Sequence, residues 1–390
     1  MKILQVISYF YPAWSYGGPG KLVYEISANL SSYENVTVYS TDAFDSKRRR
    51  NKNDNILIPK RIKTNFFANI NNYLAYRLKF FLPPFLLNKA LKEVKKFDVI
   101  HFHEFFTGTV VILSDIAFFF KVPYVISAHG TLHSFHLKNR SFLKRIFFII
   151  FGNKIIKNAS GFIAATKKEI IDYQNLGIPK HKICYIPNGI DTKLFKKLPR
   201  RGIFRNQLNI AKDAMILLYL GRINRLKGLD LLIKAFSQIQ EKEEIYLVIA
   251  GSDDGYMSVL KGLVKKQNLE KRIFFPGVLD SDLKLKVYSD TDFFIYPSPS
   301  EGFSLAILEA GAASLPLLIT EGCNFPEVEN SNSGIIVKFS LNGIKNGLMK
   351  ILENKDNLQS MGKNAHSLVT RQYSIEKMVR NLLNNYEKLK

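Results

Sequence analysis

Two glutamates stand eight residues apart in the stretch PSPSEGFSLAILEAGAASLPLLIT, residues 297–320. A strand-like run ends at its first prolines, and we expect a helix to begin near Phe303 or Ser304, after Glu301 and with Glu309 in its second turn. Backbone amides at a helix N-terminus bind phosphate, whereas carboxylates accept hydrogen bonds from hydroxyl groups. A phosphate flanked by two hydroxyl-binding carboxylates indicates a nucleotide sugar. The alternative is that Glu301 caps the helix and Glu309 is a surface residue.

A basic turn lies earlier in the chain, in YLGRINRLKGLDLLIKAF at residues 219–236. The pattern predicts a strand, a turn at Gly221 and a helix from about Gly228. Arg222 and Lys227 flank that turn. A guanidinium can bind two phosphate oxygens at once and an ammonium adds a compact charge, so the turn favours a diphosphate ligand. The alternative is two solvated cations on a loop.

Short apolar runs alternate with segments of helical periodicity, which is typical of parallel sheets covered by helices on both faces. The runs are ILQVIS, VTVYST, FDVIHFH and VPYVISAHG in the first half, and MILLYLGR, IYLVIAGS, RIFFPG, DFFIYPS, PLLIT and GIIVKF in the second. Between them, residues 184–200 combine Pro, Asn-Gly and basic residues, which indicates a loop. We predict two Rossmann-like, doubly wound parallel-sheet α/β domains facing across a cleft, with ligands beyond the carboxyl ends of the strands.

The predicted domains cover 1–190 and 191–372, and a final amphipathic helix covers 373–390. A length of 390 residues fits two domains of ordinary size. The two cysteines provide no disulfide framework, which fits a reducing compartment. The N-terminus lacks the pattern of a signal peptide, and no run reaches about 18 uncharged apolar residues, so we expect a protein that does not span a membrane.

The net charge is +23, of which residues 1–195 carry +16 and the remainder +7. This asymmetry indicates an anionic partner for the first half. Two segments, 65–97 and 135–157, mix aromatic, aliphatic and basic residues, as an interfacial membrane surface does. The alternative is core helices with basic outer faces. No DNA- or RNA-binding motif accompanies this composition, so we expect an anionic membrane surface and no nucleic acid.

The motif GRxxxxKG at 221–228, followed by ExxxxxxxE at 301–309 and preceded by PNGID at 187–191, resembles the retaining glycosyltransferases of family 4, which have the GT-B fold. The resemblance covers nearly the whole chain and is strongest from 185 to 335. Each half of this double signature is weak alone, and the two in this order are specific.

The resemblance implies roles for individual residues. Arg222 and Lys227 would bind the donor diphosphate, Glu301 would face the donor sugar and Glu309 the ribose. FFPGV at 274–278 would border the base. The backbone amides that would bind phosphate and sugar belong to Gly302, Phe303, Ser304 and Leu305.

The N-terminal half extends the resemblance. YPAWSYGGPGKLVYEIS matches the family's glycine loop, so Gly17 and Gly18 would approach the donor phosphates and the acceptor. SAHG matches its strand-end histidine, so His129 would lie beside the donor sugar. The resemblance also implies that domain 1–190 binds the acceptor, that domain 191–372 binds the nucleotide sugar, and that the final helix, 373–390, crosses back to the N-terminal domain. The chain departs from the family at Ser304, which replaces a frequent glycine in the donor-sugar pocket. It departs again at Ser314, which stands where a left-handed glycine usually ends the helix.

Two other patterns resemble metal sites. The run HFHE at 101–104, which contains His101, His103 and Glu104, suggests metal ligands together with His129, His133 and His136. We expect the first two to face opposite sides of their strand, which disfavours that interpretation. Asp290-Thr291-Asp292 imitates the DxD motif of metal-dependent transferases, but it precedes a strand, away from the edge where ligands bind.

A third pattern, Gly18-Pro-Gly20, resembles a dinucleotide-binding fingerprint but lacks its third glycine.

The predicted function is transfer of a sugar from a UDP- or GDP-linked donor to a glycan or lipid-linked acceptor, with retention at the anomeric carbon, in bacterial surface polysaccharide synthesis. Glu301, His129, Arg222 and Lys227 form the predicted catalytic set, and fixed cations replace a metal ion, so no cofactor is expected. We expect a cytoplasmic protein, peripheral on the inner face of the membrane. The alternatives are a nucleotide-sugar epimerase of the same architecture and a non-catalytic basic membrane-binding protein.

Overall fold

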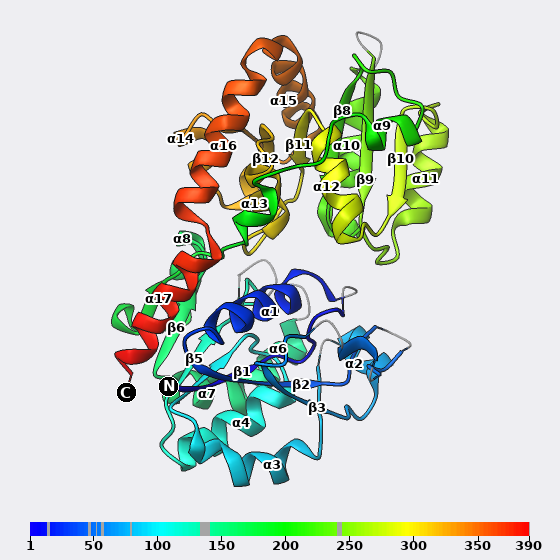
Figure 1. Cartoon of the computed structure of the whole chain (residues 1–390). Coiled ribbons are helices and arrows are strands. Elements are labelled where there is room, and N and C mark those ends of the chain that lie inside the picture. The colour runs from blue at the N-terminus through cyan, green and yellow to red at the C-terminus, as the bar shows by residue number, and fades with distance from the viewer. Residues whose placement is uncertain are drawn as a thin grey trace. The chain divides into compact units, whose positions relative to one another are not determined.

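The computed structural model describes residues 1–13, 16–45, 48–51, 53–55, 58–78, 80–132, 141–239 and 244–389. The chain divides into two compact units. The N-terminal unit comprises Met1–Gly189 and Ile375–Lys390, and the C-terminal unit comprises Ile190–Ser374. Each unit contains its own sheet with helices around it (Figure 1). The predicted fold class, two parallel α/β sheets, is confirmed.

The sheet of the N-terminal unit has seven parallel strands in the order β3-β2-β1-β4-β5-β6-β7. The central strands β4 and β5 are buried along their whole length, as expected where helices cover both faces of a parallel sheet. Three strands, β3, β6 and β7, were not among the predicted runs. The strands are β1 Lys2–Val6, β2 Asn35–Thr41, β3 Lys63–Phe67, β4 Val99–Phe102, β5 Tyr124–Ser127, β6 Gly161–Ala164 and β7 Ile183–Tyr185.

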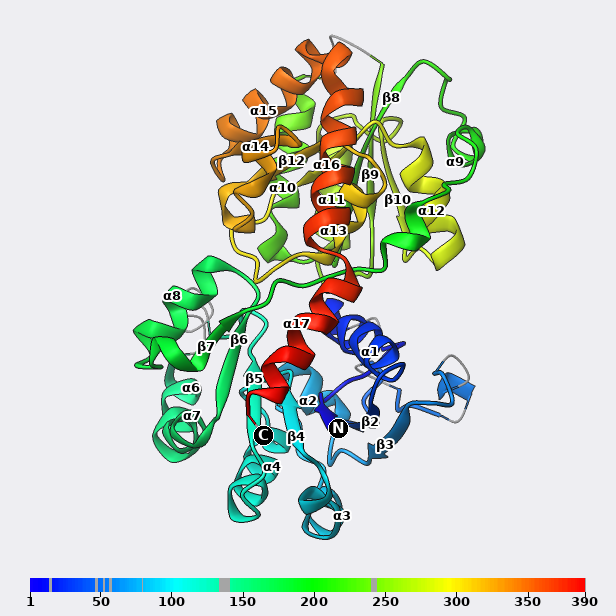
Figure 2. The same cartoon turned by 60° about the vertical axis from the view of Figure 1, so that its left-hand side comes forward.

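Helices of the N-terminal unit come from both ends of the chain. The last helix, α17, lies alongside α1 (Figure 2). It buries Ile375, Met378, Val379, Leu382 and Tyr386, which form one face of an amphipathic helix, as its periodicity predicts. The helices are α1 Gly18–Leu30, α2 Asn72–Leu78, α3 Leu86–Glu93, α4 Gly108–Phe119, α6 Ser141–Phe147, α7 Asn153–Asn158, α8 Lys167–Asn175 and α17 Ile375–Glu387, with a π-helical turn η4 Phe148–Gly152 between α6 and α7.

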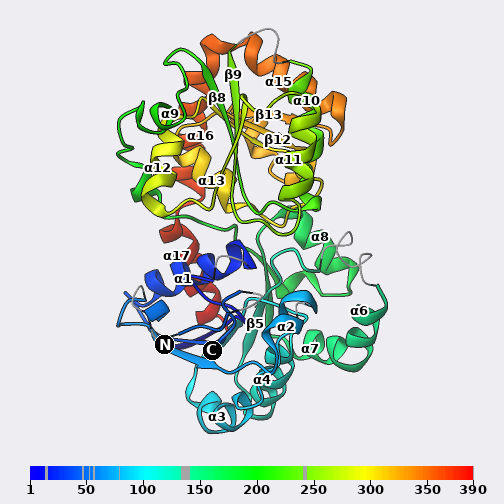
Figure 3. The ribbon, with the colours of Figure 1, turned by 90° about the vertical axis from the view of Figure 1, so that its right-hand side faces the viewer.

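The sheet of the C-terminal unit has six parallel strands in the order β10-β9-β8-β11-β12-β13. Helices α10, α11 and α15 lie on one side of it and α12, α13 and α16 on the other (Figure 3). The strands are β8 Met215–Leu220, β9 Ile245–Ala250, β10 Ile273–Gly277, β11 Phe293–Tyr296, β12 Leu317–Thr320 and β13 Gly334–Val337. The helices are α9 Ile203–Gln207, α10 Leu229–Ser237, α11 Met257–Lys266, α12 Ser281–Asp290, α13 Leu305–Ala312, α14 Glu327–Asn330, α15 Leu341–Glu353 and α16 Leu358–Gln372.

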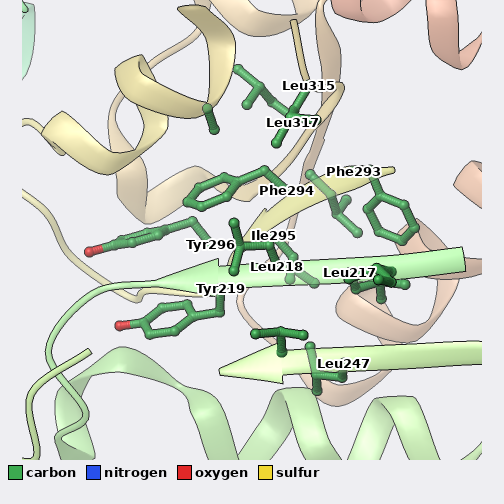
Figure 4. Close-up of a cluster of buried hydrophobic side chains, with 14 of the residues drawn as sticks. Leu217, Leu218, Tyr219, Leu247, Phe293, Phe294, Ile295, Tyr296, Leu315 and Leu317 are labelled. Carbon is green, nitrogen blue, oxygen red and sulfur yellow. The ribbon is translucent and has the colours of Figure 1, made fainter. Parts of the chain in front are cut away.

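The core of this sheet is built from aliphatic and aromatic residues of neighbouring strands (Figure 4). Leu217 and Leu218 of β8 are paired with Phe293 and Phe294 of β11, and all four are fully buried. Burial of one such side chain stabilises the fold by about 1.5–3 kcal/mol relative to leaving it exposed to water. The central strands therefore provide a stable base for the loops at their carboxyl ends.

Ser314 follows α13 in a left-handed conformation, with φ 61°. Its amide donates to the carbonyl oxygen of Gly311, and the next amide, of Leu315, donates to that of Ala310, both at 3.0 Å. This is the helix-ending geometry that usually favours glycine. The prediction of a left-handed cap at Ser314 is confirmed. Among the described residues, no helix is both long and apolar enough to cross a bilayer.

Candidate active site

The turn after β8 carries the two predicted phosphate-binding cations, Arg222 and Lys227. It ends at Gly228, whose φ is 68°. A Cβ atom at Gly228 would lie 2.2 Å from the carbonyl oxygen of Pro297, so only glycine fits there. The turn thus packs directly against the loop that follows β11. This packing places Lys227 beside Glu301.

Glu301 is held both through its backbone and through its side chain. Its amide donates to the carbonyl oxygen of Gly322 at 2.8 Å, and its own carbonyl accepts from Asn324 Nδ2 at 2.9 Å. Its carboxylate Oε1 lies 2.5 Å from Lys227 Nζ, in an ion pair whose side chains are 12% and 13% exposed. The N-cap of α13 is Ser304. The alternative that Glu301 caps this helix is therefore wrong, and the direct pairing of the two predicted site residues is a new finding.

Arg222 is oriented by an acid that the sequence reasoning did not single out. Its Nη1 lies 3.2 Å from Asp254 Oδ2, and the same oxygen accepts from Asn224 Nδ2 at 3.2 Å. Asp254 follows β9, the neighbour of β8 in the sheet. The parallel order brings the ends of both strands to one edge, and that edge holds Arg222 and Lys227.

The start of α13 presents backbone donors. Ser304 is its N-cap, but its side chain accepts no hydrogen bond from the first helical turn; it bonds the hydroxyl of Tyr296 instead. The first-turn amides, beginning at Leu305, therefore keep the anion-binding character of a helix N-terminus. The Phe303 ring packs against Phe325 and Tyr373, with centroids 5.4 and 5.6 Å apart. Because the Phe303 ring is packed in this way, Phe303 and Gly302 would contact a ligand through their backbone.

Two stacked tyrosines contact the turn that carries Arg222 and Lys227. The rings of Tyr219 on β8 and Tyr296 on β11 have centroids 5.3 Å apart, and Figure 4 shows them side by side at the carboxyl end of β8. Tyr219 donates to the carbonyl oxygen of Arg222 at 3.0 Å, and Lys227 Nζ lies 5.7 Å from the centre of the Tyr296 ring. Burial raises the pKa of both phenols well above the usual value. Both phenols are neutral, and Tyr219 supports the basic turn by its hydrogen bond whereas Tyr296 contacts Lys227 through its ring.

Glu309 lies in the second turn of α13, as predicted, but it is buried. Its two carboxylate oxygens lie 2.9 and 2.8 Å from Lys284 Nζ, and Tyr288 donates to it at 3.2 Å. Both partners come from α12. The alternative that Glu309 is a surface residue is wrong, because only 5% of it is exposed.

The glycine loop of the N-terminal unit opens α1. Gly17 is the N-cap of this helix, and its φ of 97° with ψ of −162° is a conformation essentially restricted to glycine. Gly18 is the first helical residue. Gly17 has no side chain to cap this N-terminus, which leaves room for a ligand to approach the backbone.

His129 lies two residues after the end of β5 and has a left-handed conformation, with φ 49°. Its Nε2 lies 3.2 Å from His103 Nδ1, and the His103 ring lies 3.8 Å from that of His101. The expectation that His101 and His103 face opposite sides of β4 is wrong: residues two apart along a strand share a face. Burial lowers the pKa of His129 to about 4, so the ring is neutral at pH 7. His133 and His136 lie outside the described residues.

Glu104 is a further candidate at the same edge of the N-terminal sheet, and the sequence indicated it only as part of the HFHE metal-ligand pattern. It follows β4, and its Oε2 accepts from the amide of Ser8, after β1, at 2.7 Å. Burial raises the pKa of its carboxyl group to about 7. A carboxyl group with such a pKa at a strand end can exchange a proton near neutral pH.

The DxD-like pair has a structural role. Asp290, at the end of α12, accepts hydrogen bonds from the amides of Phe204 and Arg205 at the start of α9, and its carboxylate also faces the buried Arg205 side chain. Asp292 pairs with Arg201 and accepts from the amide of Ile216. Both acids tie α9 to the amino-terminal end of the sheet, as the sequence position suggested.

The structure brings Arg222, Lys227 and Glu301 together at the carboxyl edge of the C-terminal sheet, close to the start of α13. The groups that orient them, Asp254 and Asn324, were missed. Asp254 follows β9 and Asn324 follows β12. Their position after a strand was visible in the sequence, because polar residues after any strand of the sheet are candidates, not only those after β8 and β11. Their exact partners depend on packing that no local pattern reports.

Comparisons with known proteins agree with the fold. The family model described as Glycosyltransferase Family 4 matches residues 16–194, and that described as Glycosyl transferases group 1 matches residues 200–368. An uncharacterized glycosyltransferase of Methanocaldococcus jannaschii is 26% identical over 353 residues, 82% of this chain and 86% of the relative. The alpha-galactosylglucosyldiacylglycerol synthase of Streptococcus pneumoniae is 25% identical over 276 residues, 69% of this chain and 71% of the relative. The crystal structure of Anabaena HepE with UDP and glucose has the same fold, with a TM-score of 0.80 and 19% identity over the full length of both chains.

Proposed function

This chain belongs to the glycosyltransferases of family 4 with the GT-B fold, and from that premise we propose that it transfers a sugar from a UDP- or GDP-linked donor to a glycan or lipid-linked acceptor, with retention at the anomeric carbon. The observation that carries the proposal is the Lys227–Glu301 pair, which lies beside Arg222 near the uncapped start of α13. Cations and backbone donors suit a diphosphate, and the carboxylate next to them suits sugar hydroxyls. The HepE structure holds UDP and glucose, which supports this class of donor.

In the proposed reaction, the bond between the anomeric carbon and the diphosphate breaks while the acceptor oxygen approaches from the same face. The departing diphosphate takes the acceptor proton. Arg222 and Lys227 stabilise the negative charge that develops on the leaving group, and the amides of residues 302–305 add fixed dipoles. Because these cations belong to the protein, the proposal requires no metal ion or other cofactor.

Glu301 is proposed to bind hydroxyls of the transferred sugar, and its fixed backbone supports that role because a positioned carboxylate loses little entropy on binding. Glu309 is proposed to act near the ribose. Its carboxylate already binds Lys284 and Tyr288, so it would contact the ribose as part of that cluster. In the N-terminal unit, Gly17 and Gly18 are proposed to approach phosphate and acceptor, and His129 a sugar hydroxyl.

The acceptor is proposed to be presented at an anionic membrane on the inner face of the cell, in the synthesis of a surface polysaccharide or glycolipid. The helical segment formed by α6, η4 and α7, residues 141–158, exposes Phe142, Ile149 and Ile150, of which Ile149 is 76% exposed. The basic residues Lys154 and Lys157 are exposed on the same segment. Apolar and basic side chains on one exposed helical segment are what an anionic interface binds, and the pneumococcal relative is named for a diacylglycerol product.

The test is incubation of the full chain with UDP- and GDP-sugars, with and without lipid-linked and soluble glycan acceptors. We expect release of the nucleoside diphosphate that accelerates with acceptor, in the presence of a chelator, and a product whose anomeric proton coupling matches that of the donor. An inverted product would refute retention, and activity abolished by the chelator would refute metal independence. Interconversion of the donor sugar without an acceptor would instead favour the epimerase.

A further inference from the structure

A continuous hydrogen-bonded network of polar side chains crosses the buried interior of the N-terminal unit and ends at His129. It joins β1, β4 and β5 to α17, the last helix of the chain. Gln5 and His101 are fully buried, and His103 and Tyr386 are 1% exposed. The contacts, in order, are Ser127 Oγ to His101 Nε2 at 2.8 Å, His101 Nδ1 to the Tyr386 hydroxyl at 2.7 Å, that hydroxyl to Gln5 Nε2 at 3.4 Å, Gln5 Oε1 to His103 Nε2 at 2.5 Å, and His103 Nδ1 to His129 Nε2 at 3.2 Å.

The three imidazoles of this network are neutral at pH 7. Burial lowers the pKa of His101 and His103 well below the usual value and that of His129 to about 4. A neutral imidazole has one nitrogen that donates and one that accepts, so every ring has to adopt one of two tautomers. In a buried network the tautomers are coupled, because a mismatch leaves two donors or two lone pairs facing each other.

Gln5 sets the direction of the hydrogen bonds. Its carbonyl oxygen Oε1 can only accept, so the proton of His103 is on Nε2. His103 Nδ1 is then an acceptor, and the proton that binds it has to come from Nε2 of His129. The second nitrogen of His129, Nδ1, consequently carries a lone pair.

Tyr386 bonds the amide nitrogen of Gln5 and is consistent with this orientation. Its hydroxyl accepts from the Gln5 amide nitrogen and donates to His101 Nδ1. His101 Nε2–H then donates to Ser127 Oγ. If the Gln5 amide were reversed, every proton would move to the opposite nitrogen and His129 would present an N–H group on Nδ1.

We propose that Gln5, His103 and Tyr386 are positioning residues that hold His129 in the Nε2–H tautomer, so that its Nδ1 lone pair is presented to a ligand. A lone pair accepts a hydrogen bond from a hydroxyl group and repels the oxygens of a phosphate or a carbonyl group. The network therefore selects a sugar hydroxyl as the partner of His129. The identity of this ligand rests on the proposed function, whereas the tautomer rests on the orientation of the Gln5 amide and the hydrogen bonds that extend from it.

The backbone around His129 supports a positioning role. The residue has φ 49°, and left-handed conformations of bulky residues persist only where the surroundings fix them. The adjacent amides are held: Gly130 donates to Glu169 Oε1 at 2.9 Å, and Ala128 donates to the Tyr173 hydroxyl at 3.1 Å. Ring orientation and tautomer are thus both fixed from inside the unit.

The test is the correlation NMR spectrum of the imidazole nitrogens in the full chain labelled with 15N-histidine. His129→Asn assigns the signals of His129, since asparagine tolerates a left-handed backbone. We expect the Nε2–H tautomer for His129 at pH 7. Tyr386→Phe removes the hydrogen-bond partner of the Gln5 amide nitrogen, and Gln5→Leu removes the amide itself, so each is expected to shift His129 toward a mixture of tautomers.

The matched control is Tyr124→Phe. Tyr124 is as buried as Tyr386, and its hydroxyl donates to the carbonyl oxygen of Ile155 at 2.8 Å, away from the network. Its loss should leave the His129 signals unchanged. An Nδ1–H tautomer in the natural chain overturns the proposal, and so do unchanged His129 signals in folded Tyr386→Phe and Gln5→Leu.

Transfer kinetics separate this proposal from the proposed function. We expect Tyr386→Phe to lower kcat/KM about tenfold, as loss of a group that orients a ligand-binding side chain commonly does, and Tyr124→Phe to leave it unchanged. If transfer is intact in His129→Asn, the sugar contact is refuted while the tautomer assignment is decided by NMR. If no sugar is transferred at all, the proposed function fails and the spectra still decide the tautomer.

Discussion

Lys227 and Glu301 neutralise each other across 2.5 Å, and this pairing sets what each substitution should do. A diphosphate has to compete with Glu301 for Lys227. We expect Lys227→Met to weaken UDP or GDP binding by about 10- to 100-fold, the value of one charge-assisted hydrogen bond. Glu301→Gln removes the competing charge, so diphosphate affinity should be retained or should increase, while transfer falls about 100-fold because sugar contacts are lost.

Calorimetric titration with UDP and GDP, together with transfer rates, distinguishes these two effects. Arg225→Met is the matched control, because Arg225 is an exposed cation on the same turn. It should change neither quantity by more than about twofold, as expected for an exposed charge. Equal losses of diphosphate affinity in Lys227→Met and Glu301→Gln would contradict the proposed division of roles.

Glu104 predicts a pH-dependent stability difference. Its pKa is raised to about 7 by burial, so the folded chain holds this proton between about pH 4.5 and 7 whereas the unfolded chain releases it. The contribution of Glu104 to stability is therefore lost as the pH rises through that window. Relative to the natural chain, Glu104→Gln should gain about 1–3 kcal/mol of unfolding free energy between pH 4.5 and 7.5.

Urea denaturation at several pH values measures this difference. Glu34→Gln provides a control at another acid of the same unit, directly before β2. Glu34 pairs with the N-terminal amino group and should not reproduce the trend. A difference between Glu104→Gln and the natural chain that is flat with pH would show that the Glu104 carboxyl is ionised throughout.

At the scale of elements, the sequence predicted the strands that carry the site and missed β3, β6 and β7 of the N-terminal sheet, of which β3 and β7 are its edge strands. The runs at β8, β11 and β12 are short, apolar and bounded by Pro or Gly, and they were recognised. By contrast, β3 is the edge strand KTNFF with partly exposed residues, and β7 is the three-residue ICY. Such segments become strands because a neighbouring strand offers hydrogen bonds, which no local pattern records.

The same limit applies to the groups that orient the site. Glu301 and Arg222 were predicted from a motif, but their partners Asn324 and Asp254 lie on other loops of the sheet. The network at His129 is an extreme case, since Gln5 and Tyr386 are 381 positions apart. The family resemblance implies a final helix that returns to the first domain, but the contacts of Tyr386 with Gln5 and His101 in the interior are visible only in the structure.

Gly228 connects two of these loops and gives a prediction at the scale of the element. Gly228→Ala would place Cβ 2.2 Å from the Pro297 carbonyl oxygen and 2.6 Å from the Phe339 ring, at a φ of 68°. We expect a loss of about 2 kcal/mol or more of unfolding free energy, because both the left-handed backbone and the overlap are unfavourable. Displacement of the basic turn should also weaken diphosphate binding.

Gly262→Ala is the control for Gly228→Ala. Gly262 lies inside α11, and a Cβ there would meet nothing within 4 Å. Alanine favours a helix over glycine, so this variant should gain about 0.5–1 kcal/mol. Thermal melting with and without UDP compares the pair. If Gly228→Ala and Gly262→Ala melt at the same temperature, the contact between the two loops does not determine the structure of the turn.

At the scale of the whole molecule, charge is concentrated where the exposed apolar groups are. Residues 1–195 carry a net +16 of the total +23, and the segment 141–158 adds exposed Phe142, Ile149 and Ile150 to that basic unit. Lys154, on the same segment, pairs with Asp115 in an exposed ion pair, which contributes little to folding and leaves the cation available to lipid phosphates. Attraction by charge and insertion of apolar side chains are the two contributions that peripheral membrane binding requires.

Vesicle flotation separates these two contributions. We expect the natural chain to bind vesicles rich in phosphatidylglycerol and to dissociate as salt rises, because screening shortens the range of the charge attraction to about 8 Å at physiological ionic strength. The double variant Ile149→Ser, Ile150→Ser should bind at least about tenfold more weakly, since two side chains lose apolar burial. Val259→Ser, Val278→Ser removes two comparably exposed apolar groups from the C-terminal unit and should bind like the natural chain. Equal binding by both double variants would place the membrane contact elsewhere, and no flotation at low salt would mean that the basic charge serves the nucleotide sugar or a soluble acceptor.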